Sequence, residues 1–229
     1  MDRKVFLKHE ERWIYRLLIL VAGFYGGYAM LVRGGAFSNA QTGNVALMAI
    51  ELGKGNFANA LYYLIPISAY MLGAAVSELM PRSLKKYGAV RWSTLLVLFE
   101  MVLSVVMGFI PASAPHQICQ IIINIICAMQ FNTFREAEGD PMATTFCTNL
   151  IRSVGVHLAC LLDKKKDAGE QLRKISVYAT MVLFFVVGVA GATIACHFLN
   201  TYAIWLALLP LGVLFISLLR TDLKQKVNE

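Results

Sequence analysis

The residues best suited to chemistry are ionisable side chains that interrupt apolar stretches of the chain. Glu100 falls midway along a long apolar stretch, Arg135 follows another, and Arg152 lies inside a shorter one. An ionisable group at membrane depth is costly to bury, so each marks a candidate functional site. Glu100 could carry a proton, and either arginine could bind an anionic group through paired N–H donors.

Each of these residues also has a structural interpretation. Glu100 could pair with Arg135 or Arg152, or form a neutral hydrogen-bonded acid between helices. Arg135 could be an interfacial arginine at the end of a span. An unpaired charge at Arg152 should face a cavity or Glu100.

Two short polar sequences predict helix starts within apolar segments. They are Thr42-Gly43-Asn44 and Cys147-Thr148-Asn149. Thr and Asn are good N-cap residues. A helix start at membrane depth presents free N–H groups and a partial positive charge, which favour a carboxylate or another anion. Alternatively, each sequence is a polar turn at the membrane surface. The amides of Asn124, Gln130 and Asn132 could line a cavity or bond to neighbouring helices.

The elements that position these residues are predicted to be membrane helices. The run from Ile175 to Leu219 contains no Asp, Glu, Lys or Arg. Because a helix needs roughly 20 apolar residues to cross a bilayer, this run predicts two spans joined near Asn200-Thr201. Six stretches are long enough to cross: 14–33, 58–80, 92–110, 117–134, 175–198 and 201–220. The composition, with 58% hydrophobic and 15% charged residues, predicts that residues 1–229 form one all-α membrane domain.

Basic residues distinguish two topologies, which differ in how the short segments 36–50 and 143–162 are placed. If both enter the membrane and return, every basic cluster is cytoplasmic and the neutral 111–117 turn lies outside, as the positive-inside rule requires. If both cross fully, the basic 82–91 loop lies outside. We favour a helix bundle of six spans plus two re-entrant or broken helices in the cell membrane, with both termini cytoplasmic. Eight spans remain the alternative.

The order of long and short segments repeats along the chain, which suggests halves at 1–112 and 113–229. Three spans in each half would turn the second half upside down relative to the first. Such 3+3 inverted repeats with interrupted helices are a common design of transporters.

Two smaller sequence features also predict local structure. Gly23 and Gly27 predict close helix packing, and the acidic 136–140 stretch predicts a solvated loop.

Two motifs resemble the YoaK-like family of bacterial multi-pass membrane proteins, a domain of unknown function. The first is Gly23-Phe24-Tyr25-Gly26-Gly27-Tyr28 followed by Arg33-Gly34-Gly35-Ala36-Phe37-Ser38-Asn39-Ala40-Gln41-Thr42-Gly43-Asn44. The second motif, which matches less well, comprises residues 130–135 and 144–149. The resemblance implies the bacterial inner membrane and no established substrate. It also implies an Asp in many members where Gly26 stands, so a proton-coupling role for that Asp does not transfer to this chain. The second motif departs too, since Cys147-Thr148 stands where the family often has Thr-Gly.

The sequence contains no recognisable catalytic motif, which leaves the non-enzymatic functions of a membrane protein. We find no H-E-x-x-H, G-x-S-x-G, P-loop or dinucleotide motif, so we expect no enzyme activity and no cofactor. The scattered His and Cys residues predict no metal site, and basic residues that flank apolar runs predict no nucleic-acid binding.

The leading hypothesis is a secondary transporter or channel for a small solute, with an anion favoured. Its path would be lined by Thr42, Gly43, Asn44, Glu100, Asn132, Arg135, Asn149 and Arg152. The alternative is a non-transporting membrane scaffold or assembly factor. Partners would be the lipid bilayer and the solute, with a homo-oligomer left open.

Overall fold

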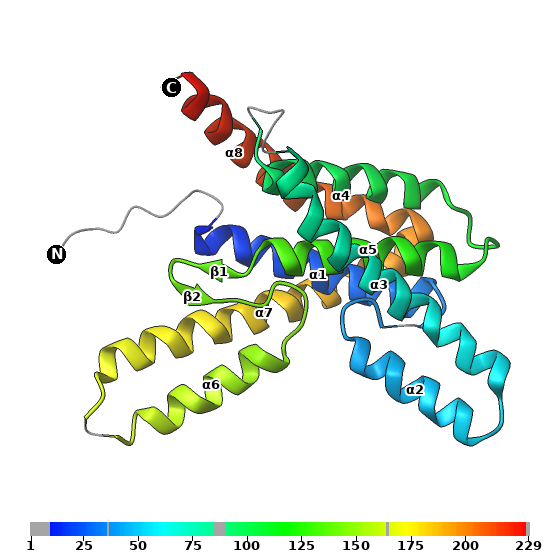
Figure 1. The fold of residues 1–229 in the computed structure, drawn as a ribbon, viewed down its shortest axis with the longest axis horizontal. Helices are drawn as coiled ribbons and strands as arrows, with labels where there is room; N and C mark the ends of the chain where they lie inside the picture. Colours follow the sequence, from blue (N-terminus) through cyan, green and yellow to red (C-terminus); the bar gives the residue numbers. More distant parts are fainter. Residues whose placement is uncertain (1–9, 36, 85–89, 164, 228–229) are drawn as a thin grey trace.

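The computed structural model describes residues 10–35, 37–84, 90–163 and 165–227, and these are mostly helical (Figure 1). This confirms the all-α prediction. The helices are α1 (Arg12–Val32), α2 (Gln41–Gly53), α3 (Phe57–Leu84), α4 (Trp92–Phe109), α5 (His116–Thr133), α6 (Thr148–Cys160), α7 (Ala168–Leu199) and α8 (Leu208–Val227). A 3₁₀ helix, Asn200–Ala207, joins α7 to α8, and a short antiparallel hairpin of β1 (Glu136–Ala137) and β2 (Asp140–Pro141) follows α5.

Helix α1 forms the centre of the core. More than half of its residues are buried, as expected for a helix that is apolar on all sides. It packs mainly against α7, and α3 packs in a similar way against α5. A Cβ atom at Gly23 would lie only 2.3 Å from the Phe185 carbonyl oxygen, and one at Gly188 only 2.1 Å from that of Leu20. These glycines let the α1 and α7 backbones touch, which confirms the close packing predicted from Gly23 and Gly27.

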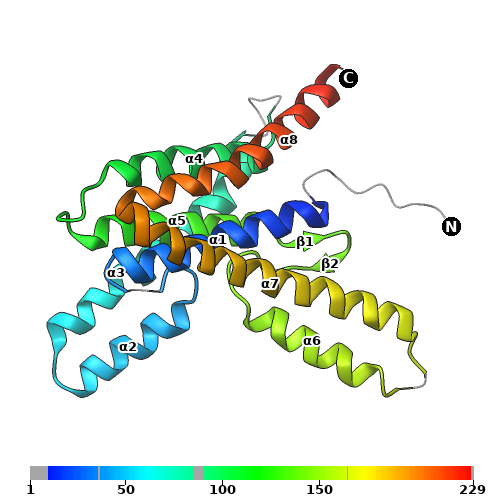
Figure 2. The same ribbon diagram turned by 180° about the vertical axis from the view of Figure 1, so that it is seen from behind.

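The two short helices α2 and α6 each form a hairpin with the helix that follows. Helix α2 packs on α3 and α6 packs on α7, and the two hairpins diverge from the centre of the molecule (Figures 1 and 2). Each short helix has 13 residues. At 1.5 Å per residue such a helix spans about 20 Å, which is less than the hydrocarbon thickness of about 30 Å.

The predicted side-chain caps of these short helices are wrong. Ala40 and Cys147 occupy the N-cap positions, and neither makes a side-chain cap hydrogen bond. Asn44 instead closes the preceding loop, since it accepts from the Phe37 N–H and donates to the Phe37 carbonyl. At the other end of α2, hydrogen bonds from Lys54, Asn56 and Asn59 lower the pKa of Glu51 to about 2.

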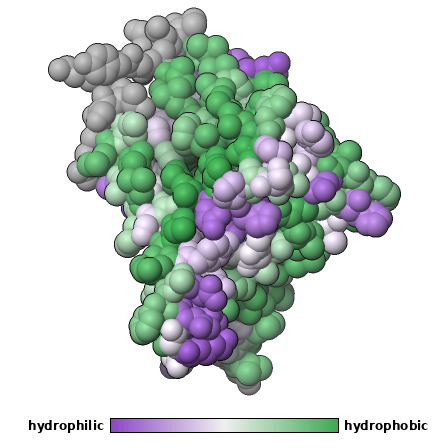
Figure 3. Space-filling model, turned by 90° about the vertical axis from the view of Figure 1, so that its right-hand side faces the viewer, coloured by the Kyte–Doolittle hydropathy of each residue, from purple (hydrophilic) through white to green (hydrophobic). Residues whose placement is uncertain are grey.

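Four helical stretches of the described chain are long and apolar enough to cross a membrane. They are Arg12–Val32, Phe57–Pro81, Trp92–Phe109 and Ala168–Lys224. The last includes both α7 and α8, with the predicted turn at Asn200, whose φ is 50°. Hydrophobic side chains cover much of the surface in Figure 3. A lipid solvent accounts for such exposure, because soluble monomers rarely expose apolar patches this extensive.

Two sequence predictions require correction. Helix α7 begins at Ala168, seven residues before the expected 175, because Asp167 caps it by accepting from the Gly169 N–H at 2.9 Å. The acidic 136–140 stretch is a β-hairpin, and its Asp140 is only 5% exposed. The solvated-loop prediction was wrong because Arg12 and Arg173 pair with that carboxylate. The basic 82–91 loop lies partly outside the described residues, which omit 85–89.

Candidate functional site

A cavity of about 410 Å³ lies where the starts of α2 and α6 meet α1 and α7. The segment before α2 contributes Phe37, Ser38, Asn39 and Ala40, and the start of α6 contributes Phe146, Cys147 and Thr148. Helix α1 contributes Gly26 and Gly27 to the lining. The first N–H groups of a helix have no partner within that helix. The cavity lies beside the starts of both helices, bordered by the segment that leads into α2 and by the first turn of α6.

The polar groups of the central cavity are few and uncharged. Ser38 is 1% exposed, and its hydroxyl has no hydrogen-bond partner among the described residues. Asn39 is 7% exposed and donates to the Ala22 carbonyl. None of the described residues that line the cavity is an Asp, Glu, Lys or Arg. A bound anion would therefore be held by N–H groups, helix dipoles and hydroxyls rather than by a fixed cation. Neither Ser38 nor Asn39 was among the predicted site residues, although both lie in the first quoted motif.

Gly26 sets the electrostatic character of the central cavity. A Cβ atom there would lie 3.4 Å from the Asn39 amide nitrogen, so a side chain could be accommodated toward Asn39. The family resemblance places an Asp at this position in many members. In this chain the glycine leaves the cavity without that negative charge.

Glu100 lies in the core on α4, away from the central cavity. It is 0% exposed, and neither carboxyl oxygen has a hydrogen-bond partner among the described residues. Close by, the hydroxyls of Tyr25 and Ser104 bond to each other at 2.7 Å. The alternative in which Glu100 pairs with Arg135 or Arg152 is wrong for the described residues, because Arg135 pairs with Glu78 at 3.0 Å and the Glu100 carboxyl group has no partner.

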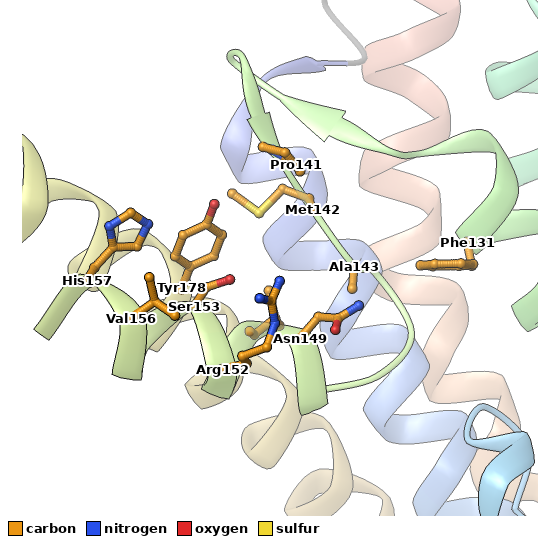
Figure 4. Close-up of a pocket in the computed structure, with 11 residues that line it drawn as sticks. Phe131, Pro141, Met142, Ala143, Asn149, Arg152, Ser153, Val156, His157 and Tyr178 are labelled. Carbon is orange, nitrogen blue, oxygen red and sulfur yellow. The ribbon is translucent and has the colours of Figure 1, made fainter. Parts of the chain in front are cut away.

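A second cavity, of about 340 Å³, lies between α6, α7 and the segment after β2 (Figure 4). Its polar lining comes from Asn149, Arg152, Ser153, His157 and Tyr178. The prediction that Arg152 faces a cavity or Glu100 is confirmed for the cavity. Asn149, which was predicted as a possible N-cap at a helix start, lines this second cavity rather than the central one.

The other predicted residues line neither cavity. A Cβ atom at Gly43 would lie 2.6 Å from the Phe37 ring, so glycine allows that ring to pack on α2. Thr42 is exposed. Asn132 donates to Ser77 at 2.8 Å and, with Arg135, to the exposed Glu78. The eight predicted path residues therefore lie in several places rather than along one cavity.

Sequence reasoning missed a buried arginine at the end of α1. Arg33 is 0% exposed, and its guanidinium donates to the carbonyls of Ile110 at 2.7 Å and Pro111 at 3.1 Å. It also donates to the Tyr28 hydroxyl at 2.9 Å. A cation is favourable at a helix C-terminus, where carbonyls lack partners. Arg33 therefore anchors the end of α4.

An acid from another helix holds the opposite end of α4. Asp222 of α8 accepts from the Arg91 backbone N–H at 2.9 Å and from the Thr94 hydroxyl at 2.7 Å. Helix α4, which carries Glu100, is thus fixed at both termini by side chains from other helices.

Comparison with known proteins identifies the family. A family model described as "Protein of unknown function (DUF1275)" matches residues 14–217. The UPF0700 transmembrane protein YoaK of Bacillus subtilis (strain 168) is 22% identical over 211 residues, which cover 91% of this chain and 92% of that protein. No solved structure matches. Because the family model covers most of the chain, this multi-pass membrane protein belongs to the DUF1275 family.

Proposed function

We propose that this protein is a secondary transporter or channel for a small solute that carries a carboxylate or similar anionic group. The observation that carries the proposal is the meeting of the α2 and α6 starts at one cavity. Broken helices whose N-termini face a shared site are a recurrent way to hold an anion inside a membrane protein. The family name supplies no substrate, so the proposal rests on this cavity.

The packing of the helices supports a 3+3 inverted repeat, in which α1–α4 correspond to α5–α8. Contacts between α1 and α7 then correspond to those between α5 and α3, and the α2–α3 hairpin corresponds to the α6–α7 hairpin. In this arrangement α1, α3, α4, α5, α7 and α8 are the six spans and α2 and α6 are re-entrant. Both termini are cytoplasmic, in keeping with the basic clusters.

The central cavity offers both an anion site and apolar walls. Each helix start contributes roughly 0.3–1 kcal/mol to binding of a negative charge at an exposed site, and up to about 2 kcal/mol when partly buried. The unpartnered Ser38 hydroxyl adds a donor. Phe37, Phe146 and Phe185 supply apolar surface for the rest of the solute. The absence of a fixed cation from this lining fits a site that must also release its solute.

The test uses purified protein in proteoliposomes and a panel of small carboxylates, with charge movement recorded on a solid-supported membrane. Gly26→Asp places a negative charge between the two helix starts and should abolish the signal. Gly26→Asn is the matched neutral variant and should retain it. Ser38→Ala should weaken the apparent affinity about ten-fold, the effect of roughly 1.4 kcal/mol. Ser176→Ala, on the exposed surface of α7, is the control.

Cys147 provides a second readout, because it lines the same cavity. In a variant whose other four cysteines are replaced, a transported carboxylate should slow alkylation of Cys147 by N-ethylmaleimide. The proposal fails if no carboxylate moves charge or protects Cys147. It also fails if Gly26→Asp transports as well as Gly26→Asn. The first result would favour a non-transporting scaffold, whereas the second would place the anion site away from this cavity.

A further inference from the structure

The cavity of Figure 4 shares no lining residue with the central cavity. We propose that it is a second binding site, for a carboxylate or phosphate group, with Arg152 as its cation. The proposal goes beyond transport, since the site could bind its ligand whether or not the protein moves a solute. A volume of about 340 Å³ is within the range of small-molecule sites.

Arg152 supplies the positive charge of this cavity. Among the described residues, no side chain forms a hydrogen bond or ion pair with its guanidinium, which lines the cavity. The nearby acids are already paired: Asp140 binds Arg12 at 3.2 Å and Arg173 at 3.0 Å, and Glu138 binds Arg12 at 3.2 Å. Helix α6 itself contains no Asp or Glu. The positive charge of Arg152 is therefore left for a ligand.

Other polar groups gather around Arg152. Asn149 lies three residues before Arg152 on α6, so the two share a face, and Ser153 also lines the cavity. Neither side chain has a hydrogen bond within the described chain. Tyr178 of α7 also lines the cavity (Figure 4). Its ring stacks on His157 at 5.8 Å between centroids, and His157 bonds Gln171 at 2.7 Å. His157 and Tyr178 are therefore held in place, while Asn149, Arg152 and Ser153 keep their side-chain donors free of the other described residues.

The surroundings of α6 strengthen the case for an anion. Its outer face is apolar, with Ile151 59% and Leu158 51% exposed. An arginine beside a lipid-facing surface is expensive unless its charge is neutralised. A carboxylate or phosphate can accept two N–H bonds from one guanidinium in a planar fork. That anion could come from a soluble molecule or from a lipid headgroup, which share this chemistry.

The experiment measures the melting temperature of the purified full chain in a neutral detergent. The protein is titrated with sodium phosphate, with sodium acetate, and with short-chain phosphatidylglycerol, each against sodium chloride or phosphatidylcholine at matched concentration. The variants are Arg152→Gln and Arg152→Lys. Lys54→Gln, which removes a positive charge from the exposed α2–α3 turn, is the control.

At least one anionic probe should stabilise the wild type and Lys54→Gln. Arg152→Gln should weaken its apparent affinity about ten-fold or more, because the substitution removes the positive charge and the paired N–H donors of the guanidinium. Arg152→Lys should be intermediate, since it keeps the charge and loses the fork. Stabilisation by phosphate or acetate identifies a soluble ligand, and stabilisation by phosphatidylglycerol alone identifies a headgroup. The proposal is overturned if no probe stabilises the wild type, or if Arg152→Gln responds as the wild type does.

Discussion

The carboxyl group of Glu100 occupies the core of α4 without a hydrogen-bond partner among the described residues. Burial of an unsatisfied polar group costs roughly 1–3 kcal/mol. Glu100→Met, an apolar replacement of similar volume, should therefore raise the melting temperature in detergent.

Ser104→Ala removes the hydrogen-bond partner of the Tyr25 hydroxyl and should lower the free energy of unfolding by about 1 kcal/mol, measured by the same thermal unfolding.

The melting temperature and the charge-movement assay together separate a structural role of Glu100 from a functional one. If Glu100→Met unfolds more readily than the wild type, then Glu100 has a stabilising partner in the folded protein and its unpaired state is refuted. If Glu100→Met is more stable but inactive in the charge-movement assay, the acid is retained for function. That result would support a proton-carrying role for Glu100.

Arg33 shows why burial of single residues is hard to predict from this sequence. It follows an apolar stretch, where the positive-inside rule reads arginine as an interfacial residue. Its side chain instead turns into the core, because α4 ends there with carbonyls that need a donor. That need arises between α1 and α4, which are far apart in the chain, and no local pattern reveals it. Arg152 was easier to predict, since its own helix contains no acid.

At the scale of helices, the contact between α1 and α7 depends on glycine at one position of α7 and not at another nearby. A Cβ atom at Gly188 would lie 2.1 Å from the Leu20 carbonyl oxygen, whereas one at Gly191 would meet nothing within 4 Å. Gly188→Ala should separate the helices and lower the stability by about 1–3 kcal/mol. Gly191→Ala should be neutral or stabilise by up to about 1 kcal/mol, because alanine favours a helix.

Thermal unfolding in detergent, monitored by size exclusion after heating, measures both glycine variants. The two substitutions add the same methyl group to the same helix, so their difference isolates the contact with α1. Equal melting temperatures for Gly188→Ala and Gly191→Ala would contradict the close approach of the two helices.

Helix boundaries could be predicted where the apolar run and the helix coincide. The expected stretches 92–110 and 117–134 match α4 and α5 within one residue at each end. The start of α7 could not be predicted in this way, because hydrophobicity marks the part of a helix that lies in lipid and α7 continues beyond it. The helix starts of α2 and α6 lie within the predicted motifs. Their N-cap residues were not predicted, because Ala40 and Cys147 occupy these positions and neither makes a side-chain cap hydrogen bond.

For the whole molecule, the correspondence of the two halves decides how the candidate site could work. If α1–α4 and α5–α8 are related by an inverted repeat, then α2 and α6 approach the central cavity from opposite sides of the membrane. Each helix start then belongs to a different half, and relative movement of the halves would open the cavity to one side at a time. If both short helices cross the membrane instead, this account of the cavity loses its basis.

The two topologies predict different accessibility for the exposed loops, so single cysteines can separate them. In a background that lacks the five native cysteines, Lys54→Cys, Ala112→Cys and Lys165→Cys are treated with a membrane-impermeant thiol reagent on intact cells. All three positions are exposed in the structure. Six spans predict labelling at 54 and 112 but not at 165, whereas eight spans predict labelling at none of them. Lysed cells, in which all three should react, control for reagent access. Labelling confined to lysed cells would therefore refute the inverted repeat and, with it, the alternating opening of the central cavity.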